Sequence, residues 1–128
     1  MNLMEGKLEK HNGWVYFNEG NFMVKLQDKM YSKPGVYERK EVTFGIRPEN
    51  IRNSSMAMLS SSGTQITAKV EVIELIGNKS IIYLTIGKTP FIARLDSHVP
   101  IQENQMKSLI LNVDKAQIFD KQTEQTIV

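Results

Sequence analysis

Residues 64–95, TQITAKVEVIELIGNKSIIYLTIGKTPFIARL, decide the fold class of this chain. Apolar side chains recur at every second position along three segments of this stretch. That period places one row of side chains on one face of a β-strand. Short turns containing glycine separate the segments, at Gly77-Asn78 and at Gly87-Lys88. The stretch therefore predicts three antiparallel strands joined by two hairpins.

In the first of these segments, the alternation of apolar and polar residues is interrupted. The apolar positions from Ile66 to Val72 share one phase, but the next position in that phase is Glu74. Because a charged side chain is costly to bury, we expect a one-residue β-bulge near Val72 and Ile73. Such a bulge would reset the phase and turn Glu74 away from the core.

The rest of the chain repeats the strand pattern. Alternating apolar residues over 22–26, 42–46 and 109–113, and strand-forming aromatic residues over 14–17, predict further short strands. Tight turns are predicted at residues 12–13 and 18–21. Residues 27–33 have room for one or two helical turns, residues 53–63 are predicted to be a mobile loop, and residues 100–105 a connection. The pattern predicts an all-β fold, a small barrel or a sandwich.

Composition narrows the classes of function. The chain has 128 residues, which fits a single domain over 1–128. Its formal net charge is +2 with interleaved signs, which argues against a nucleic-acid or anionic-membrane surface. Cysteine is absent, so disulfides, thiolate nucleophiles and cysteine zinc sites are excluded. No apolar run approaches the roughly 20 residues that span a bilayer.

Two short patterns resemble known binding sites, one for phosphate and one for a metal ion. In both cases the surrounding residues favour a purely structural role. Residues 87–89, Gly-Lys-Thr, resemble the end of a phosphate-binding loop, but Ile82 replaces the required earlier glycine. A strand pattern also follows where the loop needs a helix, so we expect a hairpin turn and no nucleotide binding. Asp96 and His98 are too few ligands for a metal site.

An aromatic group near the N-terminus allows two interpretations. Trp14, Tyr16 and Phe17, with Lys7 and Lys10, could form a base-stacking platform of the kind that binds single-stranded nucleic acid. Alternatively, one face of this strand belongs to the core, and the other is covered by hairpin strands of the same chain or by a second copy. The low net charge favours the second interpretation.

Residues 44–51, FGIRPENI, carry a more specific signal. They resemble the Gly-Ile-Arg-Pro-Glu-Asp-Ile stretch in the C-terminal domain of ATP-binding subunits of ABC sugar importers, especially the maltose and multiple-sugar group. Four further segments are similar to that domain in the same order. Residues 1–6 resemble its start, 70–77 its Val-x-Val-Val-Glu-x-x-Gly, 91–96 its Phe-Val-Ala-Arg-Val-Asp, and 118–124 its ending. The resemblance covers nearly the whole chain.

This resemblance implies an OB-like small barrel with additional antiparallel hairpin strands, of the TOBE type. It implies a non-catalytic regulatory and dimer-supporting domain of the subunit; the alternative is a stand-alone OB-type module that binds single-stranded nucleic acid or a small ligand. The ATPase domain, which would bind ATP and Mg²⁺, is expected upstream, and this chain is expected to hold no cofactor. The Ser-Ala-Arg-Asn-x-Leu motif of molybdate-binding relatives is absent, which argues against an oxyanion ligand.

The resemblance also implies partners and a location. The expected partners are a second copy of the subunit, membrane-spanning permease subunits contacted through the ATPase domain, and regulatory proteins, with no direct nucleic acid. The expected location is cytoplasmic, peripheral at the inner face of the cell membrane.

The motif residues are the candidate structural or interface residues; no catalytic or metal-binding residue is expected. Pro48 is expected to hold Arg47 extended and to begin a helical turn, at whose start Glu49 is favourably placed. Gly45 is expected to let backbone approach closely across the strand. Arg47 and Glu49 would fasten the strand end to a neighbouring loop, with a secondary interface role left open. The full set is Gly45, Arg47, Pro48, Glu49, Glu74, Gly77, Arg94, Asp96 and Phe119.

Overall fold

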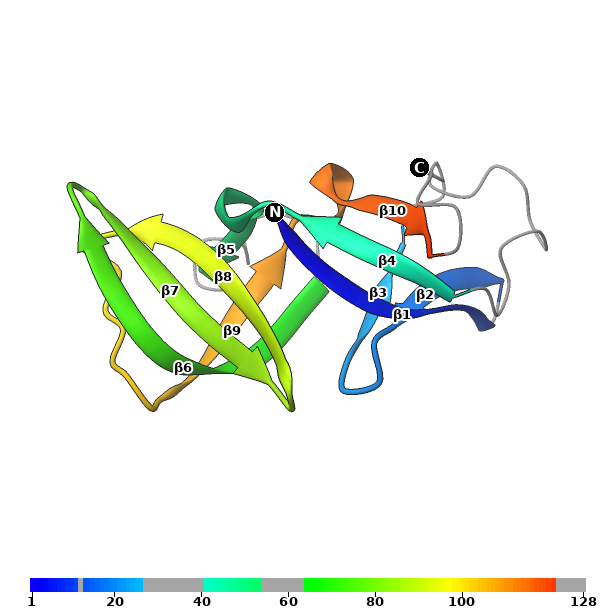
Figure 1. Ribbon diagram of the computed structural model, residues 1–128, viewed down its shortest axis with the longest axis horizontal. Coiled ribbons are helices and arrows are strands. Elements are labelled where there is room, and N and C mark those ends of the chain that lie inside the picture. Colours follow the sequence, from blue (N-terminus) through cyan, green and yellow to red (C-terminus); the bar gives the residue numbers. More distant parts are fainter. Residues whose placement is uncertain (12, 27–40, 54–63, 122–128) are drawn as a thin grey trace.

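The computed structural model describes residues 1–11, 13–26, 41–53 and 64–121, and within them the chain forms two five-stranded antiparallel sheets (Figure 1). Sheet A has the order β10-β4-β1-β2-β3, and sheet B has the order β5-β9-β6-β7-β8. Sheet A comprises β1 (Asn2–His11), β2 (Trp14–Asn18), β3 (Met23–Lys25), β4 (Glu41–Ile46) and β10 (Gln117–Asp120). Sheet B comprises β5 (Ile51–Asn53), β6 (Thr64–Ile76), β7 (Lys79–Ile86), β8 (Thr89–Asp96) and β9 (Met106–Leu111).

Sheet B curls into a small barrel. Its edge strand β5, together with the short 3-10 helix η2 (Pro48–Asn50), packs against β8 at the opposite edge of the same sheet. Sheet A lies beside this barrel, and residue 1 lies at the seam between the two (Figure 1). The predicted OB-like barrel with additional hairpin strands is therefore confirmed.

A β-bulge interrupts β6, the strand whose apolar phase fails in the sequence. The β6–β7 register shifts between Val70 and Val72, which leaves Glu71 as the extra residue. The bulge thus lies just before the expected position at Val72 and Ile73. Its consequence is the expected one, because Glu74 is exposed and Ile73 packs against the core.

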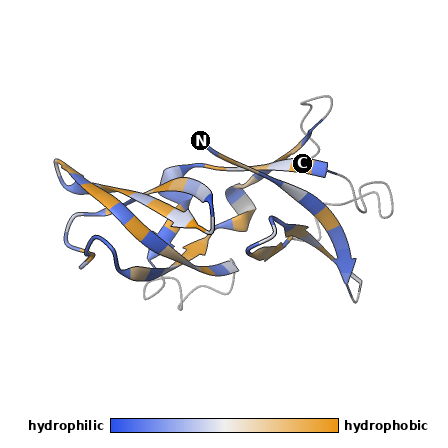
Figure 2. Ribbon diagram, turned by 60° about the horizontal axis from the view of Figure 1, so that its bottom comes forward, coloured by the Kyte–Doolittle hydropathy of each residue, from blue (hydrophilic) through white to orange (hydrophobic). Residues whose placement is uncertain are grey.

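The predicted alternation holds along the strands (Figure 2). Inward positions of both sheets contribute to one apolar core, in which the rings of Phe17 and Phe44 stack with centroids 5.0 Å apart. Members of this core from sheet A include Met4, Leu8, Val24, Val42 and Ile46, and members from sheet B include Ile66, Ala68, Ile82, Leu84, Phe91 and Leu109.

The hairpin turns lie where glycine predicts them. Gly77 and Gly87 have φ of 61° and 59°, values that favour glycine in a two-residue hairpin turn. Residues 100–105 connect β8 to β9, as expected. The prediction for residues 27–33 lies outside the described residues, and so does the predicted loop over 53–63 except for Asn53, which is the last residue of β5. Within the described ranges, no helix is long and apolar enough to cross a bilayer.

The two sheets are fastened to each other along β8. Asn2, buried at the start of β1, donates from Nδ2 to the Ile92 carbonyl (2.7 Å) and accepts at Oδ1 from the Ile92 N–H (2.7 Å). Ile92 lies in an edge strand, so the Asn2 amide satisfies backbone groups that the sheet leaves unpaired. At the start of β8, the Thr89 hydroxyl donates to the Glu19 carboxylate of the β2–β3 turn.

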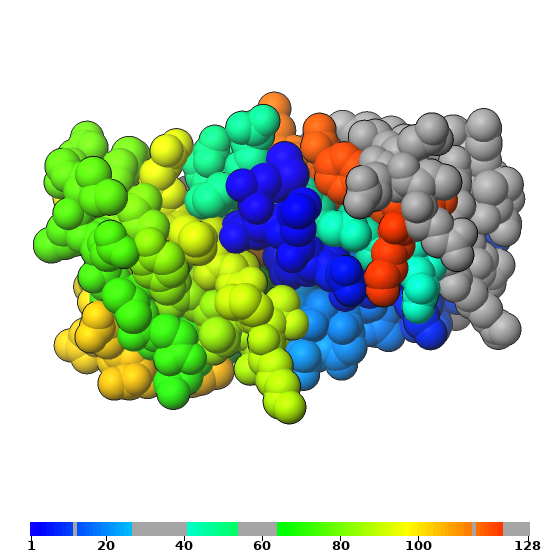
Figure 3. Space-filling model, viewed as in Figure 1, coloured from blue at the N-terminus to red at the C-terminus, as the bar shows by residue number. Residues whose placement is uncertain are grey.

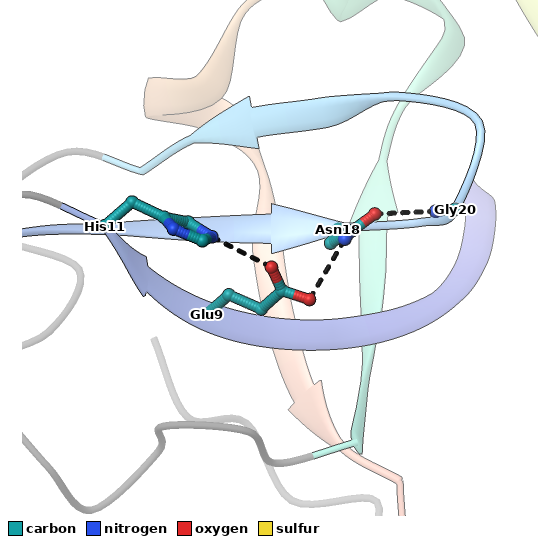
Figure 4. Close-up of polar contacts among 4 residues, drawn as sticks. All are labelled: Glu9, His11, Asn18 and Gly20. Atoms are coloured by element: carbon teal, nitrogen blue, oxygen red, sulfur yellow. Dashed lines mark hydrogen bonds and ion pairs between the residues drawn. The ribbon is translucent and has the colours of Figure 1, made fainter.

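A polar network braces the β2–β3 turn (Figure 4). The Glu9 carboxylate accepts from Asn18 Nδ2 (3.0 Å) and lies 2.9 Å from His11 Nε2, while Asn18 Oδ1 accepts from the Gly20 N–H (2.9 Å). The hydrogen bond with His11 holds the pKa of Glu9 below its ordinary value. The network joins the β1–β2 hairpin to the turn that contacts sheet B through Glu19.

Candidate functional site

Two of the sequence motifs meet where the barrel closes. Residues 44–51 run from the end of β4 through η2 into β5, and residues 91–96 lie in β8. Arg47 is extended (φ −76°, ψ 148°) and Pro48 begins η2, as the sequence predicts. Glu49 Oε1 then lies 3.9 Å from Arg94 Nη2 on β8. The two motifs thus supply the two edges that close the barrel.

A second ion pair lies beside the first. Lys79 and Asp96 are cross-strand partners of β7 and β8, and Lys79 Nζ lies 2.6 Å from Asp96 Oδ1. This hydrogen bond holds the pKa of the Asp96 carboxyl below its ordinary value. Gly77 forms the turn that precedes Lys79, and the Asn78 carbonyl of that turn accepts from the Ser97 N–H (3.0 Å).

These groups line a shallow hollow of about 440 Å³, which we call the charged hollow. Arg52 is exposed and forms no ion pair with any described residue, so three cationic side chains face two anionic ones. Such an arrangement suits electrostatic contact with the surface of a partner. Its charged and titratable lining residues are Glu49, Arg52, Lys79, Arg94, Asp96 and His98.

Replacing Lys79 by methionine is expected to raise the pKa of Asp96 toward its ordinary value of about 3.9. Because the folded-state pKa is lowered, the pair's contribution to stability is present above that ordinary value and is lost as pH falls through the lowered one. A carboxyl NMR titration measures the shift. Lys88→Met, in the exposed β7–β8 turn, is the control, and an unchanged Asp96 pKa in Lys79→Met would contradict the account.

Gly45 and Phe119 lie away from the charged hollow, on the outer face of sheet A. A Cβ at Gly45 would lie 2.8 Å from Met1 Sδ, 3.1 Å from Phe119 Cε2 and 3.3 Å from Leu3 Cδ2. The close approach at Gly45 therefore comes from three side chains. This corrects the expectation that backbone approaches there.

Glu74 lies on the outer face of sheet B, beyond the bulge. Its carboxylate accepts a hydrogen bond that raises the pKa of the Tyr83 phenol. The nine motif residues thus separate into one group around the charged hollow, a second on the outer face of sheet A, and Glu74 between the β6–β7 tip and Tyr83.

The aromatic group at residues 14–17 does not form an open platform. Phe17 is fully buried in the core. The Trp14 ring lies under Lys25 of β3, whose Nζ is 3.6 Å from the ring centroid, and the Tyr16 ring meets the edge of His11 at 5.7 Å. Side chains of the same hairpins therefore cover part of the outer face, while Trp14 remains 37% exposed.

Comparison with protein families agrees with this geometry. A model described as the MalK OB fold domain matches residues 1–51, and a model described as the TOBE domain matches residues 44–119. The chain belongs to the TOBE domain family. The TOBE match contains the barrel and both motifs of the charged hollow, and the MalK OB match contains β1 to β4 of sheet A.

This TOBE domain chain is similar to two ATP-binding proteins that are named for sugar transport. It is 33% identical over 124 residues to the oligosaccharides import ATP-binding protein MsmX of Bacillus subtilis, covering 97% of this chain and 33% of that protein. It is 37% identical over 101 residues to the multiple sugar-binding transport ATP-binding protein MsmK of Streptococcus mutans, covering 79% of this chain and 26% of that protein. The chain thus spans about a third or less of these relatives.

The fold of the TOBE domain chain also recurs in a solved structure. A crystal structure of the cytoplasmic molybdate-binding protein ModG, with molybdate bound, matches with a TM-score of 0.68. The match covers 91% of this chain and 94% of ModG at 14% identity. At that identity, the likeness shows the fold alone.

The sequence did not single out three residues of this TOBE domain. Asn2 had a detectable signal, because it is polar and shares the inward phase of Met4 and Leu8 in β1. Arg52 and Lys79 had none, since their importance depends on which strands close the barrel. Among the described residues, no group of three or more potential metal-binding side chains is present.

Proposed function

We propose that this chain is the regulatory and dimer-supporting domain of the ATP-binding subunit of a carbohydrate importer, and that it is itself non-catalytic. The observation that carries the proposal is its similarity to MsmX along 97% of its own length but only 33% of that protein. ATP, Mg²⁺ and the permease subunits would be bound by the remainder of the subunit. The subunit would lie at the inner face of the cell membrane.

The geometry supports a non-catalytic role. Gly87 and Lys88 form the β7–β8 turn and Thr89 begins β8, so this turn leads into a strand and not into a helix N-terminus that could hold a phosphate. The charged hollow offers paired and unpaired charges at an exposed corner, which suits a regulatory protein better than a small substrate.

Self-association of the isolated domain is expected to be weak. A small interface has to offset several kcal/mol of lost translational and rotational freedom. Sedimentation equilibrium over a wide concentration range should show a monomer–dimer equilibrium that shifts with concentration. A strictly monomeric chain would count against a dimer-supporting role.

Calorimetry tests which part of the subunit binds ATP. ATP with Mg²⁺ should give no saturable heat with the 128-residue chain, because its Gly-Lys-Thr sequence comprises a two-residue hairpin turn and the first residue of β8. The subunit as its gene encodes it should bind ATP saturably. Binding to the short chain, or none to the encoded subunit, would contradict the proposed function. Salt-sensitive binding of a single-stranded oligonucleotide would favour the alternative module.

A further inference from the structure

A band of exposed and partly exposed apolar side chains crosses the seam between the two sheets. Val72, Tyr83 and Ile92 are cross-strand partners in a row across β6, β7 and β8, and all three point away from the core. On the other side of the seam the band continues on sheet A through Met1, Leu3 and Phe119, which meet above Gly45. We call these six residues the apolar band.

Two hollows lie within the apolar band, so its surface is concave in two places. One, of about 460 Å³, lies between Met1 and Leu3 on one side and Tyr83 and Ile92 on the other. The second, of about 450 Å³, lies between Met1, Leu3 and Phe119. Met1 and Leu3 line both hollows while 53% and 61% exposed, and Val72 is 46% exposed. Exposed apolar residues gathered around hollows are typical of a surface that another protein element covers.

Asn2 determines what can reach this surface. Its two hydrogen bonds to Ile92 hold the start of β1 between the sheets, at the centre of the band (Figures 1 and 3). A polypeptide joined to residue 1 would therefore begin next to the apolar band. MsmX has about two thirds of its length outside the region that this chain matches.

We propose that the apolar band is the surface on which the nucleotide-binding part of the same subunit packs, with a segment of it filling the hollows beside Met1. This inference rests on the proposed function. Covalent attachment gives the occupant a high effective concentration, so a band too small to hold a free partner suffices for an attached one. Interfaces between domains of one chain resemble transient interfaces between separate proteins.

Oxidative footprinting tests the occupant. The 128-residue chain and the subunit as its gene encodes it are exposed to hydroxyl radicals, and modification is read by mass spectrometry. The account predicts several-fold lower modification of Met1 and Leu3 in the encoded subunit. Met23 and Met106, which are 40% and 62% exposed and lie outside the band, serve as controls and should be modified equally in both.

A variant sharpens the test. Leu3→Glu in the encoded subunit should restore the modification of Met1, while Leu75→Glu, at the exposed tip of the β6–β7 hairpin, should not. Equal modification of Met1 in chain and subunit would overturn the inference. So would protection that grows with protein concentration, because a second copy would then cover the band. An encoded protein that binds no ATP would instead defeat the proposed function, whatever the footprint shows.

Discussion

Replacement of Gly6 by alanine should lower the free energy of unfolding by about 3 kcal/mol, at the upper end of what overpacking costs. A Cβ there would lie 2.4 Å from the Asn18 carbonyl oxygen and 2.7 and 2.8 Å from Cε1 and Cζ of Phe17. The carbonyl belongs to β2, which is paired with β1, and the Phe17 ring is stacked on Phe44 in the core. Neither neighbour can move without disturbing the β1–β2 ladder or the core. Urea denaturation followed by circular dichroism measures the change.

Gly45→Ala is the matched control. Its new Cβ would meet the ends of the Met1, Leu3 and Phe119 side chains, two of which are more than half exposed. Because these side chains can shift, we expect a loss of about 1 kcal/mol. Equal losses for the two variants would show that the Asn18 carbonyl and the Phe17 ring are not the rigid neighbours described above.

Asn2→Ala should cost about 3 kcal/mol, because it removes both hydrogen bonds to Ile92 and leaves an N–H and a carbonyl without partners. Gln65→Ala, at an exposed position of β6, is the control and should change the stability little. The measurement is again urea denaturation of the 128-residue chain. A loss as small as that of Gln65→Ala would mean that Asn2 does not fasten the sheets.

Asn2→Asp tests the two hydrogen bonds individually, because it keeps the acceptor of Asn2 and removes its N–H donor. A carboxylate still accepts from the Ile92 N–H but repels the Ile92 carbonyl, so protonation of this aspartate is favoured in the folded state and its pKa is raised. Stability should therefore be regained as pH falls through the raised folded-state pKa, and be lost as pH rises through it. Asn2→Ala should show no such recovery. Identical pH profiles for the two variants would contradict the assigned donor and acceptor.

Local patterns predicted most of the fold. The period of two along residues 64–95 predicted β6, β7 and β8, and the glycine turns predicted their hairpins, because both signals depend on neighbouring residues alone. The phase failure at Glu74 predicted the bulge but not its position at Glu71. A bulge is sited by packing against the partner strand, which the sequence of one strand does not contain.

The candidate site was only partly predictable. Arg94, Asp96 and Glu49 were selected because they belong to two motifs, but their meeting depends on β5 and η2 reaching β8 across the barrel. Lys79 and Arg52 line the charged hollow for the same reason, because strands that are far apart in the sequence pack together there. Gly45 was expected to let backbone approach closely, but a Cβ there would instead meet the side chains of Met1, Leu3 and Phe119.

The most direct test of the central claim is purification of the protein as its gene encodes it, from its own cell membranes and through an affinity tag. If the chain is part of an importer's ATP-binding subunit, it should copurify in fixed stoichiometry with membrane-spanning subunits that detergent alone releases. The purified complex should hydrolyse ATP in a magnesium-dependent manner. Recovery of the chain as a lone soluble polypeptide, or bound to nucleic acid and without ATP hydrolysis, would contradict the account.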